Sequence, residues 1–182
     1  MPAPYAELPN PSTRFPRPGA SIAGMIRPAT SADVPAILEL IRALAVYEKL
    51  LDQFVITEAQ LREHLFGPRP YAEVVVAEEG TRLVGYALFF HTYSTFLGRP
   101  SLYLEDLFVL PELRGKGHGK ALLARLAQIA VERNCGRFEW MVLDWNTPAI
   151  QFYESLGAAV LPEWKLCRMT GDALRQFAAT AK

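Results

Sequence analysis

The chain has 182 residues, about half of them apolar, and its 19 basic residues balance 19 acidic ones. This length suits one domain with a hydrophobic core, and the zero net charge gives no overall field that would recruit nucleic acid or an anionic membrane. No apolar run approaches the roughly 20 residues that span a bilayer, and the presence of only two cysteines argues for a reducing, cytoplasmic setting.

Proline dominates the start of the chain, with six prolines in the first eighteen residues. Because proline blocks helices and has no backbone donor, we expect residues 1–24 to form a disordered or extended leader. The alternative is that this leader docks on the rest of the protein through Tyr5 and Phe15. Residues 25–182 are expected to form a single domain.

The rest of the chain alternates between strand patterns and the three-to-four-residue spacing of helices. In chain order the pattern predicts a strand (24–30), two helices (31–48 and 56–67), three strands (71–79, 82–93 and 101–110), a helix (119–134), a strand (137–143), a helix (146–157), a strand pair or bent strand (158–170) and a closing helix (171–181). Consecutive strands predict antiparallel pairing, and the later strand–helix–strand order predicts a parallel crossover. The fold class is therefore α/β, a mixed and mostly antiparallel sheet with helices on both faces.

Two short-range signals support these boundaries. Thr57 and Gln60 form the capping-box pattern of the second helix, and Gly67 stands where that helix should stop. Gly80 falls in the turn between two strand patterns and predicts a hairpin there.

The stretch RGKGHGKAL, residues 114–122, combines three glycines with basic side chains immediately before a helix. A helix start offers unpaired amides and a positive dipole end, which suit a phosphate group. The P-loop pattern fails because Arg114 stands where its first glycine belongs, and the G-x-G-x-x-G pattern fails because its last position is Lys120. What remains is R-x-x-G-x-G, which predicts amides that face a pyrophosphate. The predicted contacts are Arg114, Gly115, Lys116, Gly117, His118, Gly119 and Lys120.

The sequence on both sides of the loop extends this pattern. The loop, preceded by YLEDLFVLPEL and followed by WNTPAIQFYESLGA, resembles the GNAT superfamily of acetyl-CoA-dependent N-acetyltransferases over about residues 25–170. Within it, IRPATSADVPAILELIRALAVYE, ITEAQL…FG and LYLEDLFV resemble the spermidine/spermine (diamine) N-acetyltransferases. The resemblance implies acetyl-CoA as cofactor, with its pyrophosphate on the loop and its pantetheine arm paired like an added strand with Leu107, Phe108 and Val109. It also implies a homodimer with the acceptor pocket near the subunit interface.

Two residues match the catalytic pair of that group. An alkylamine with a pKa near 10.4 is almost fully protonated at pH 7, so freeing the nucleophile costs roughly 4–5 kcal/mol. Glu105 matches the general base that takes this proton, directly or through water. Tyr153 matches the general acid that protonates the leaving thiolate, and Tyr153 and Asn146 are also expected to contact the cofactor. On a regular strand Asp106 would point away from Glu105, and a bulge would bring both to the cleft.

The expected acceptor is a primary amine on a small cationic molecule. Members of the group often show Asp-Pro-Trp before the acidic strand, where this chain has Ser-Thr-Phe at residues 94–96. The missing acid and tryptophan leave room for a shorter diamine or a lysine-like amino acid beside the polyamines. The predicted acceptor contacts are Tyr47, Glu48, Phe96, Glu105 and Asp106.

Two other functions remain open from the sequence. One is acetylation of a protein N-terminus or a lysine side chain, and the other is a CoA-binding module without turnover. The three histidines share no ligand spacing with each other or with a cysteine, so no metal is assigned.

Overall fold

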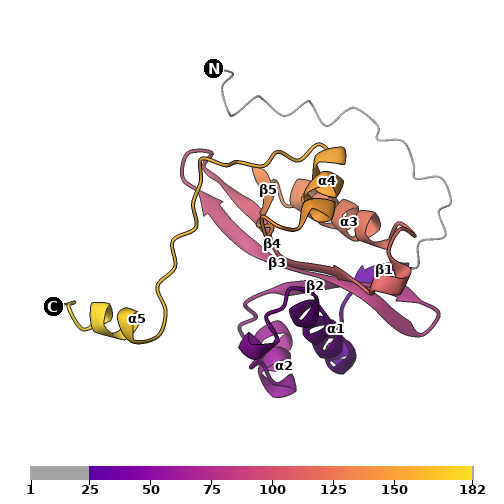
Figure 1. Ribbon diagram of the computed structural model, residues 1–182, viewed down its shortest axis with the longest axis horizontal. Coiled ribbons are helices and arrows are strands. Elements are labelled where there is room, and N and C mark those ends of the chain that lie inside the picture. Colours follow the sequence, from indigo (N-terminus) through magenta and orange to yellow (C-terminus); the bar gives the residue numbers. More distant parts are fainter. Residues whose placement is uncertain (1–24, 182) are drawn as a thin grey trace. The chain divides into compact units, whose positions relative to one another are not determined.

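A computed structural model describes residues 25–181 of the chain (Figure 1). The described residues fall into two compact units that divide between Met141 and Val142. None of the helices in this part of the chain is both long enough and apolar enough to cross a membrane. The expectations for the leader lie outside the described residues, and a single domain over residues 25–182 stays a prediction.

The first unit is a five-stranded sheet with helices on both faces. Its elements in chain order are β1 (Met25–Pro28), the 3-10 turn η1 (Ser31–Asp33), α1 (Val34–Tyr47), η2 (Leu51–Gln53), α2 (Glu58–Phe66), β2 (Glu73–Glu79), β3 (Arg82–Ser94), β4 (Arg99–Val109), η3 (Pro111–Leu113), α3 (His118–Glu132) and β5 (Arg137–Trp140). The strands lie in the order β1-β2-β3-β4-β5, and all neighbours are antiparallel except β4 and β5. The predicted mixed sheet and its parallel crossover are therefore confirmed.

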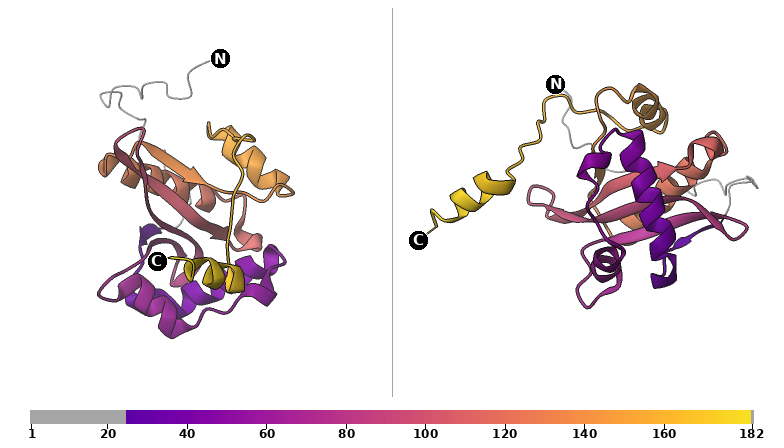
Figure 2. Two further views of the ribbon diagram at one scale, coloured as in Figure 1. Left: turned by 90° about the vertical axis from the view of Figure 1, so that its left-hand side faces the viewer. Right: turned by 60° about the horizontal axis from the view of Figure 1, so that its bottom comes forward.

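Helices α1 and α2 cover one face of the sheet and α3 covers the other (Figures 1 and 2). The apolar residues of α1 recur every three to four positions, which places them on one stripe. Those from Val34 to Leu44 are buried and pack with α2, with Tyr86 of β3 and with Phe108 of β4. Each fully buried aliphatic side chain contributes about 1.5–3 kcal/mol, so this layer holds α1 firmly against the sheet.

The short-range signals at element ends are confirmed. The Gln60 amide donates to Thr57 Oγ1 at 3.3 Å, and the Thr57 amide donates to the Gln60 side chain at 2.9 Å, which completes the capping box. Helix α2 ends at Phe66, directly before Gly67. Gly80 has a φ of 63° in the turn between β2 and β3, a left-handed conformation that glycine adopts without strain.

The second unit contains the two predicted helices α4 (Thr147–Ser155) and α5 (Gly171–Ala178). The strand pair or bent strand predicted over residues 158–170 was wrong, because the structure has no strand between these helices. Apolar and β-branched residues favour a strand only where a neighbouring strand completes the ladder, and the described part of this unit has none. Leu161 and Trp164 are accordingly exposed.

Candidate active site

The C-terminal half of β4 presents an open edge. β5 pairs only with residues 101–104, so on the side of β4 that faces away from β3, no strand in the described part of the first unit lies beside residues 105–109. Leu110 donates its N–H to the Val84 carbonyl of β3 at 3.0 Å. Successive residues of β4 direct their backbone N–H and C=O groups alternately toward β3 and away from it. The N–H and C=O groups of Leu107 and Val109 therefore point away from β3. An extended ligand can add to this edge as an extra strand.

A β-bulge at Glu105 interrupts the β3–β4 ladder at the start of this edge. Leu88 of β3 pairs with Asp106 and Phe89 pairs with Leu104, which leaves Glu105 as the extra residue. Asp106 therefore shares the sheet face of Leu88, which packs against the α1–α2 core, whereas Leu104 shares the opposite face with Phe89. The bulge considered from the sequence is present: Leu104 and Asp106 are two residues apart on β4 but lie on opposite faces of the sheet, and Asp106 lies on the α1 side.

A pocket of about 270 Å³ lies on the α1 side of the bulge. The last turns of α1 form one wall, because Ile41, Ala45 and Glu48 recur on one helix face. Lys49 then adopts a left-handed φ of 61°, and residues 50–56 return to form another wall. The lining residues are Ile41, Leu44, Ala45, Glu48, Leu50, Gln53, Phe54, Val55, Ile56 and Asp106. The pocket thus combines apolar walls with two of the carboxylates that were predicted to bind the acceptor.

Burial opposes ionisation of both carboxyl groups. Desolvation raises the pKa of Asp106 to about 6; the Tyr86 hydroxyl, which donates to Oδ2 at 3.1 Å, opposes this rise, and the charges of Glu105 and Glu48 add to it. Burial also raises the pKa of Glu48. Ionised carboxylates that are partly desolvated and lie close to other negative charges are stabilised by a cation placed between them. The pocket is therefore suited to an ammonium group.

Glu48, Glu105 and Asp106 form an acidic cluster, and Glu105 is its exposed member. Its side chain makes no hydrogen bond or ion pair with a described residue, although its charge acts on Asp106 and Tyr86. An accessible carboxylate at the start of the open edge can accept a proton from an amine, directly or through one water.

The glycine-rich loop ends at the start of α3. Gly115 and Gly117 have φ values of 78° and 92°, in the left-handed region where a side chain is strained. Gly117 takes the N-cap position without a side-chain cap, and the first paired amide is that of Ala121, which donates to the Gly117 carbonyl at 2.9 Å. The N–H groups of residues 118–120 have no acceptor among the described residues. This arrangement suits an anion at the helix start.

His118 supports the loop from the protein interior. Its side chain is fully buried, and Nε2 lies 2.8 Å from Oε1 of Glu79 on β2, while Nδ1 has no partner among the described residues. The contribution of His118 to a phosphate site is therefore limited to its backbone N–H. Lys116 and Lys120 are exposed and form no ion pair with a described residue, so their charge is available to an anion.

Arg114 connects the loop to α1. Its Nε donates to the Val109 carbonyl at 3.1 Å, and its guanidinium lies over the Tyr47 ring, 4.3 Å from the ring centroid. Tyr47 is not among the residues that line the acidic pocket; its ring instead supports the Arg114 side chain through a cation–π contact.

The remaining predicted residues lie elsewhere. Phe96 is 91% exposed in the turn between β3 and β4. Six residue pairs of the β3–β4 ladder, about 20 Å of strand, separate that turn from Asp106. Asn146 and Tyr153 belong to the second unit. Asn146 precedes α4 without capping it through its side chain, and the Tyr153 ring packs 5.6 Å from the ring of Phe152.

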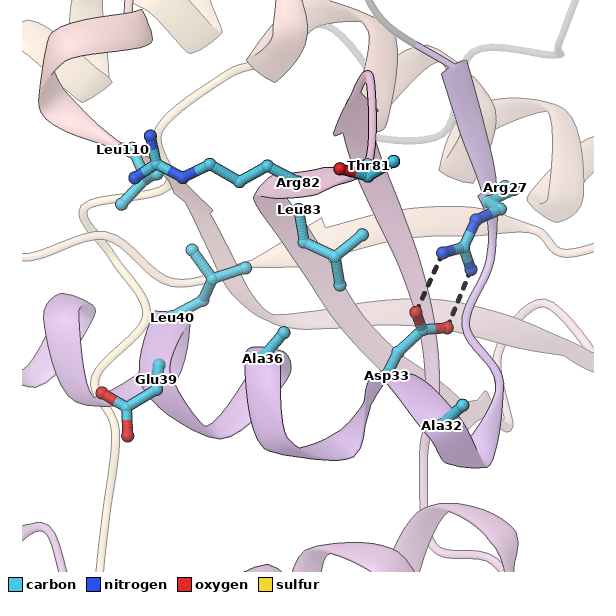
Figure 3. A pocket seen from close by; sticks show the side chains of 10 residues that line it. All are labelled: Arg27, Ala32, Asp33, Ala36, Glu39, Leu40, Thr81, Arg82, Leu83 and Leu110. Atoms are coloured by element: carbon cyan, nitrogen blue, oxygen red, sulfur yellow. Dashed lines mark hydrogen bonds and ion pairs between the residues drawn. The ribbon is translucent and has the colours of Figure 1, made fainter.

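A second and larger pocket, of about 570 Å³, lies beside the N-terminal half of α1 (Figure 3). It contains none of the predicted site residues. Its lining residues are Arg27, Ala32, Asp33, Ala36, Glu39, Leu40, Thr81, Arg82, Leu83 and Leu110. The guanidinium of Arg27 is occupied by Asp33 and Glu78, and Arg82 is paired with Glu112.

Tyr86 was not predicted as a site residue. Among the described residues, its hydroxyl is the one group in contact with Asp106 that favours the ionised carboxylate. The signal was a tyrosine within the apolar run of residues 83–90, but its partner depends on the register between β3 and β4, which a pattern within one strand does not reveal.

An open strand edge, a helix start with unpaired amides and an acidic pocket together suit a group-transfer enzyme with a phosphate-bearing donor and an amine acceptor. The sequence profile of the acetyltransferase (GNAT) family matches residues 43–158. The chain belongs to this family and is an N-acetyltransferase that acts on amines. The co-substrate of the family is acetyl-CoA.

Named relatives cover most of the chain. A thialysine N-epsilon-acetyltransferase from Sus scrofa is 42% identical, over 85% of this chain and 96% of the relative. The L-ornithine N5-acetyltransferase NATA1 of Arabidopsis thaliana is 36% identical, over 95% of this chain and 96% of the relative. An integron cassette protein from the mobile metagenome of V. cholerae has a similar solved structure, with a TM-score of 0.75 and 27% identity over 88% of this chain and all of that one.

Proposed function

We propose that this enzyme moves an acetyl group from acetyl-CoA to a primary amine of a small cationic acceptor, a diamine, polyamine or lysine-like amino acid. The observation that carries the proposal is the acidic pocket of Glu48 and Asp106 beside the open edge of β4. The edge offers backbone groups to an extended donor, and the pocket offers carboxylates to an ammonium.

The donor is held by backbone groups. Acetyl-CoA supplies a thioester carbonyl that an amine can attack. Leu107 and Val109 offer N–H groups to its pantetheine arm, and the amides of residues 118–120, with Lys116 and Lys120, offer donors and charge to its pyrophosphate. Glycine at position 117 keeps this approach free of a side chain.

The acidic cluster of Glu48, Glu105 and Asp106 binds and deprotonates the acceptor. Glu48 and Asp106 bind the cation, because their half-buried carboxylates have lost part of their hydration and gain most from a positive partner. Glu105 takes the proton of the attacking amine, directly or through water, because it is accessible at the bulge. Tyr153 returns a proton to the thiolate, since a phenol with a pKa near 10 is protonated at neutral pH.

The size of the pocket favours a short acceptor. About 270 Å³ bounded by α1 and residues 50–56 suits one aliphatic chain with a terminal ammonium, and the exposed Phe96 adds no wall to it. Two of the relatives carry names of enzymes that acetylate thialysine and ornithine, both amino acids with a side-chain amine. We therefore place lysine-like amino acids and short diamines ahead of spermine.

A substrate panel tests this proposal. Thiol release from acetyl-CoA is measured with diamines, polyamines, basic amino acids and short peptides, and we expect turnover with a short diamine or a lysine-like amino acid. Glu48→Gln should raise the KM for that amine about tenfold, the effect of losing roughly 1.4 kcal/mol, and leave the KM for acetyl-CoA unchanged. Glu63→Gln, an exposed acid on α2, is the control. Turnover only with peptides would contradict the small acceptor, and acetyl-CoA binding without thiol release would indicate a non-catalytic module.

Two further properties are part of the proposal. The family resemblance implies a homodimer with the acceptor pocket near the subunit interface, and the presence of only two cysteines favours a cytoplasmic location. A monomer in sedimentation velocity at micromolar concentration would contradict the first, and cell fractionation tests the second.

A further inference from the structure

Tyr86 reaches the acceptor pocket from inside the sheet. Its side chain is fully buried and belongs to the core between α1, α2 and the sheet. Its hydroxyl donates a hydrogen bond to Oδ2 of Asp106 at 3.1 Å. A phenylalanine would fill nearly the same space, so packing alone does not account for the hydroxyl.

The ladder register puts Asp106 within reach of Tyr86. From the Tyr86–Phe108 pair the ladder runs regularly to the Leu88–Asp106 pair, and the extra residue Glu105 comes directly before Asp106. Tyr86 is two residues from Leu88 and lies on the same face, where diagonal neighbours on adjacent strands are within reach of a long side chain. The contact between Tyr86 and Asp106 is therefore set by the regular part of the ladder between β3 and β4.

The two oxygens of the Asp106 carboxylate have different surroundings. Oδ2 receives the Tyr86 hydrogen bond, whereas Oδ1 makes no hydrogen bond with a described residue, and Asp106 lines the pocket. A carboxylate that is fixed at one oxygen presents the other in a set direction, and hydrogen bonds to charged groups are stronger than neutral ones.

We propose that Tyr86 is a positioning residue of the acceptor site, whose hydroxyl fixes the Asp106 carboxylate so that its second oxygen receives the ammonium of the acceptor. The inference rests on the proposed amine acceptor and goes beyond it, because it gives a role to a residue that does not line the pocket.

The hydroxyl also opposes the effect of burial on the charge of Asp106. Three groups from three elements act on Asp106: Glu48 at the end of α1, Glu105 of β4 and Tyr86 of β3. The two carboxylates disfavour its ionisation, as does burial, and within residues 25–181 the Tyr86 hydroxyl alone favours it. Tyr86 therefore keeps Asp106 ionised to a lower pH than it would otherwise reach, and so extends acceptor binding toward acid.

Removal of the hydroxyl tests the proposal. In Tyr86→Phe we expect the KM for the amine to rise about tenfold, with the KM for acetyl-CoA within twofold of its original value. Because a hydrogen bond that favours the ionised form is lost, the acidic limb of kcat/KM for the amine should move up by about 1 pH unit. A carbon-detected NMR titration of Asp106 should show the same upward movement. Tyr71→Phe, which removes an exposed hydroxyl from the same unit, should change none of these quantities.

A double-mutant cycle separates positioning from packing. In an Asp106→Asn background the further change Tyr86→Phe should alter the KM for the amine by less than about twofold, since the group to be positioned is already changed. An equally large effect in both backgrounds would overturn the proposal, as would a titration of Asp106 that Tyr86→Phe leaves unchanged while turnover persists. If no amine is acetylated by the unaltered protein, the proposed function fails first and the role of Tyr86 fails with it.

A second perturbation applies even where Tyr86→Phe does not fold. Site-specific incorporation of 3-fluorotyrosine at position 86 keeps the hydroxyl and makes it a stronger donor. The titration of Asp106 and the acidic limb should then move toward lower pH, in the direction opposite to that of Tyr86→Phe. Movement in the same direction, or none, would overturn the proposal.

Discussion

Neutralising Asp106 should stabilise the protein while weakening its binding of the acceptor. Burial raises the pKa of this carboxyl from 3.8 to about 6. At about 1.4 kcal/mol for each unit of pKa, ionising Asp106 in the folded protein at pH 8 therefore costs up to about 3 kcal/mol relative to the unfolded chain. Asp106 is partly exposed, so screening by water brings the expected value to about 1–3 kcal/mol.

The sign of the pH dependence follows from the raised pKa. The folded state holds the proton of Asp106 more tightly than the unfolded state, so the destabilisation is nearly absent below about pH 4, grows between pH 4 and 6, and is constant above. Asp106→Asn has the same shape without the charge. It should raise the free energy of unfolding by about 1–3 kcal/mol at pH 8 and by less than about 1 kcal/mol near pH 4.

Urea unfolding at the two pH values measures this difference, with Asp52→Asn as an exposed control that should show little of it. The same variant should raise the KM for the amine, because the pocket loses a carboxylate. An equal change in stability at pH 4 and pH 8 would refute the reasoning, since it would mean that burial does not oppose the charge on Asp106.

Three further predictions concern catalysis, the loop and the sheet. Tyr153→Phe should lower kcat by about 10²–10⁴-fold and leave CoA affinity by calorimetry within twofold; a variant with full turnover would remove Tyr153 as the acid. Gly117→Ala should raise the KM for acetyl-CoA at least about tenfold, because a side chain is strained at a φ of 92°. The control is Gly98→Ala, at a φ of 61° in a distant turn, which should lower stability without changing the KM for acetyl-CoA. Gly85→Ala should cost about 1–3 kcal/mol in urea unfolding, because its Cβ would lie 2.7 Å from the Phe108 carbonyl; an unchanged midpoint would show that β3 and β4 separate easily.

The local elements were predictable because their signals are short in range. The capping box of α2, the Gly80 turn and the stripe of α1 each depend on residues within one or two turns of one another. The strand prediction for residues 158–170 was wrong because it depended on a partner elsewhere in the chain. A strand exists only where a second strand completes its ladder, and a pattern of apolar residues does not reveal whether that partner is present.

The site was predictable in part. The bulge that the sequence left open is present, but of the two acids only Asp106 lines the pocket, and only the register shows that Glu105 is the extra residue. Likewise the sequence places His118 inside the loop, but its burial against Glu79 depends on β2, far away in the chain. Tyr86 could not be identified as a partner of Asp106 without both strands.

The most direct test of the donor site is amide hydrogen exchange with and without CoA, followed by NMR at three consecutive residues of β4. We predict that CoA slows amide exchange at Leu107 and Val109 by at least about tenfold, since their N–H groups point to the open edge. Exchange at Phe108, whose N–H points to β3, should stay unchanged. No slowing at Leu107 and Val109 at saturating CoA would contradict a donor that lies along this strand.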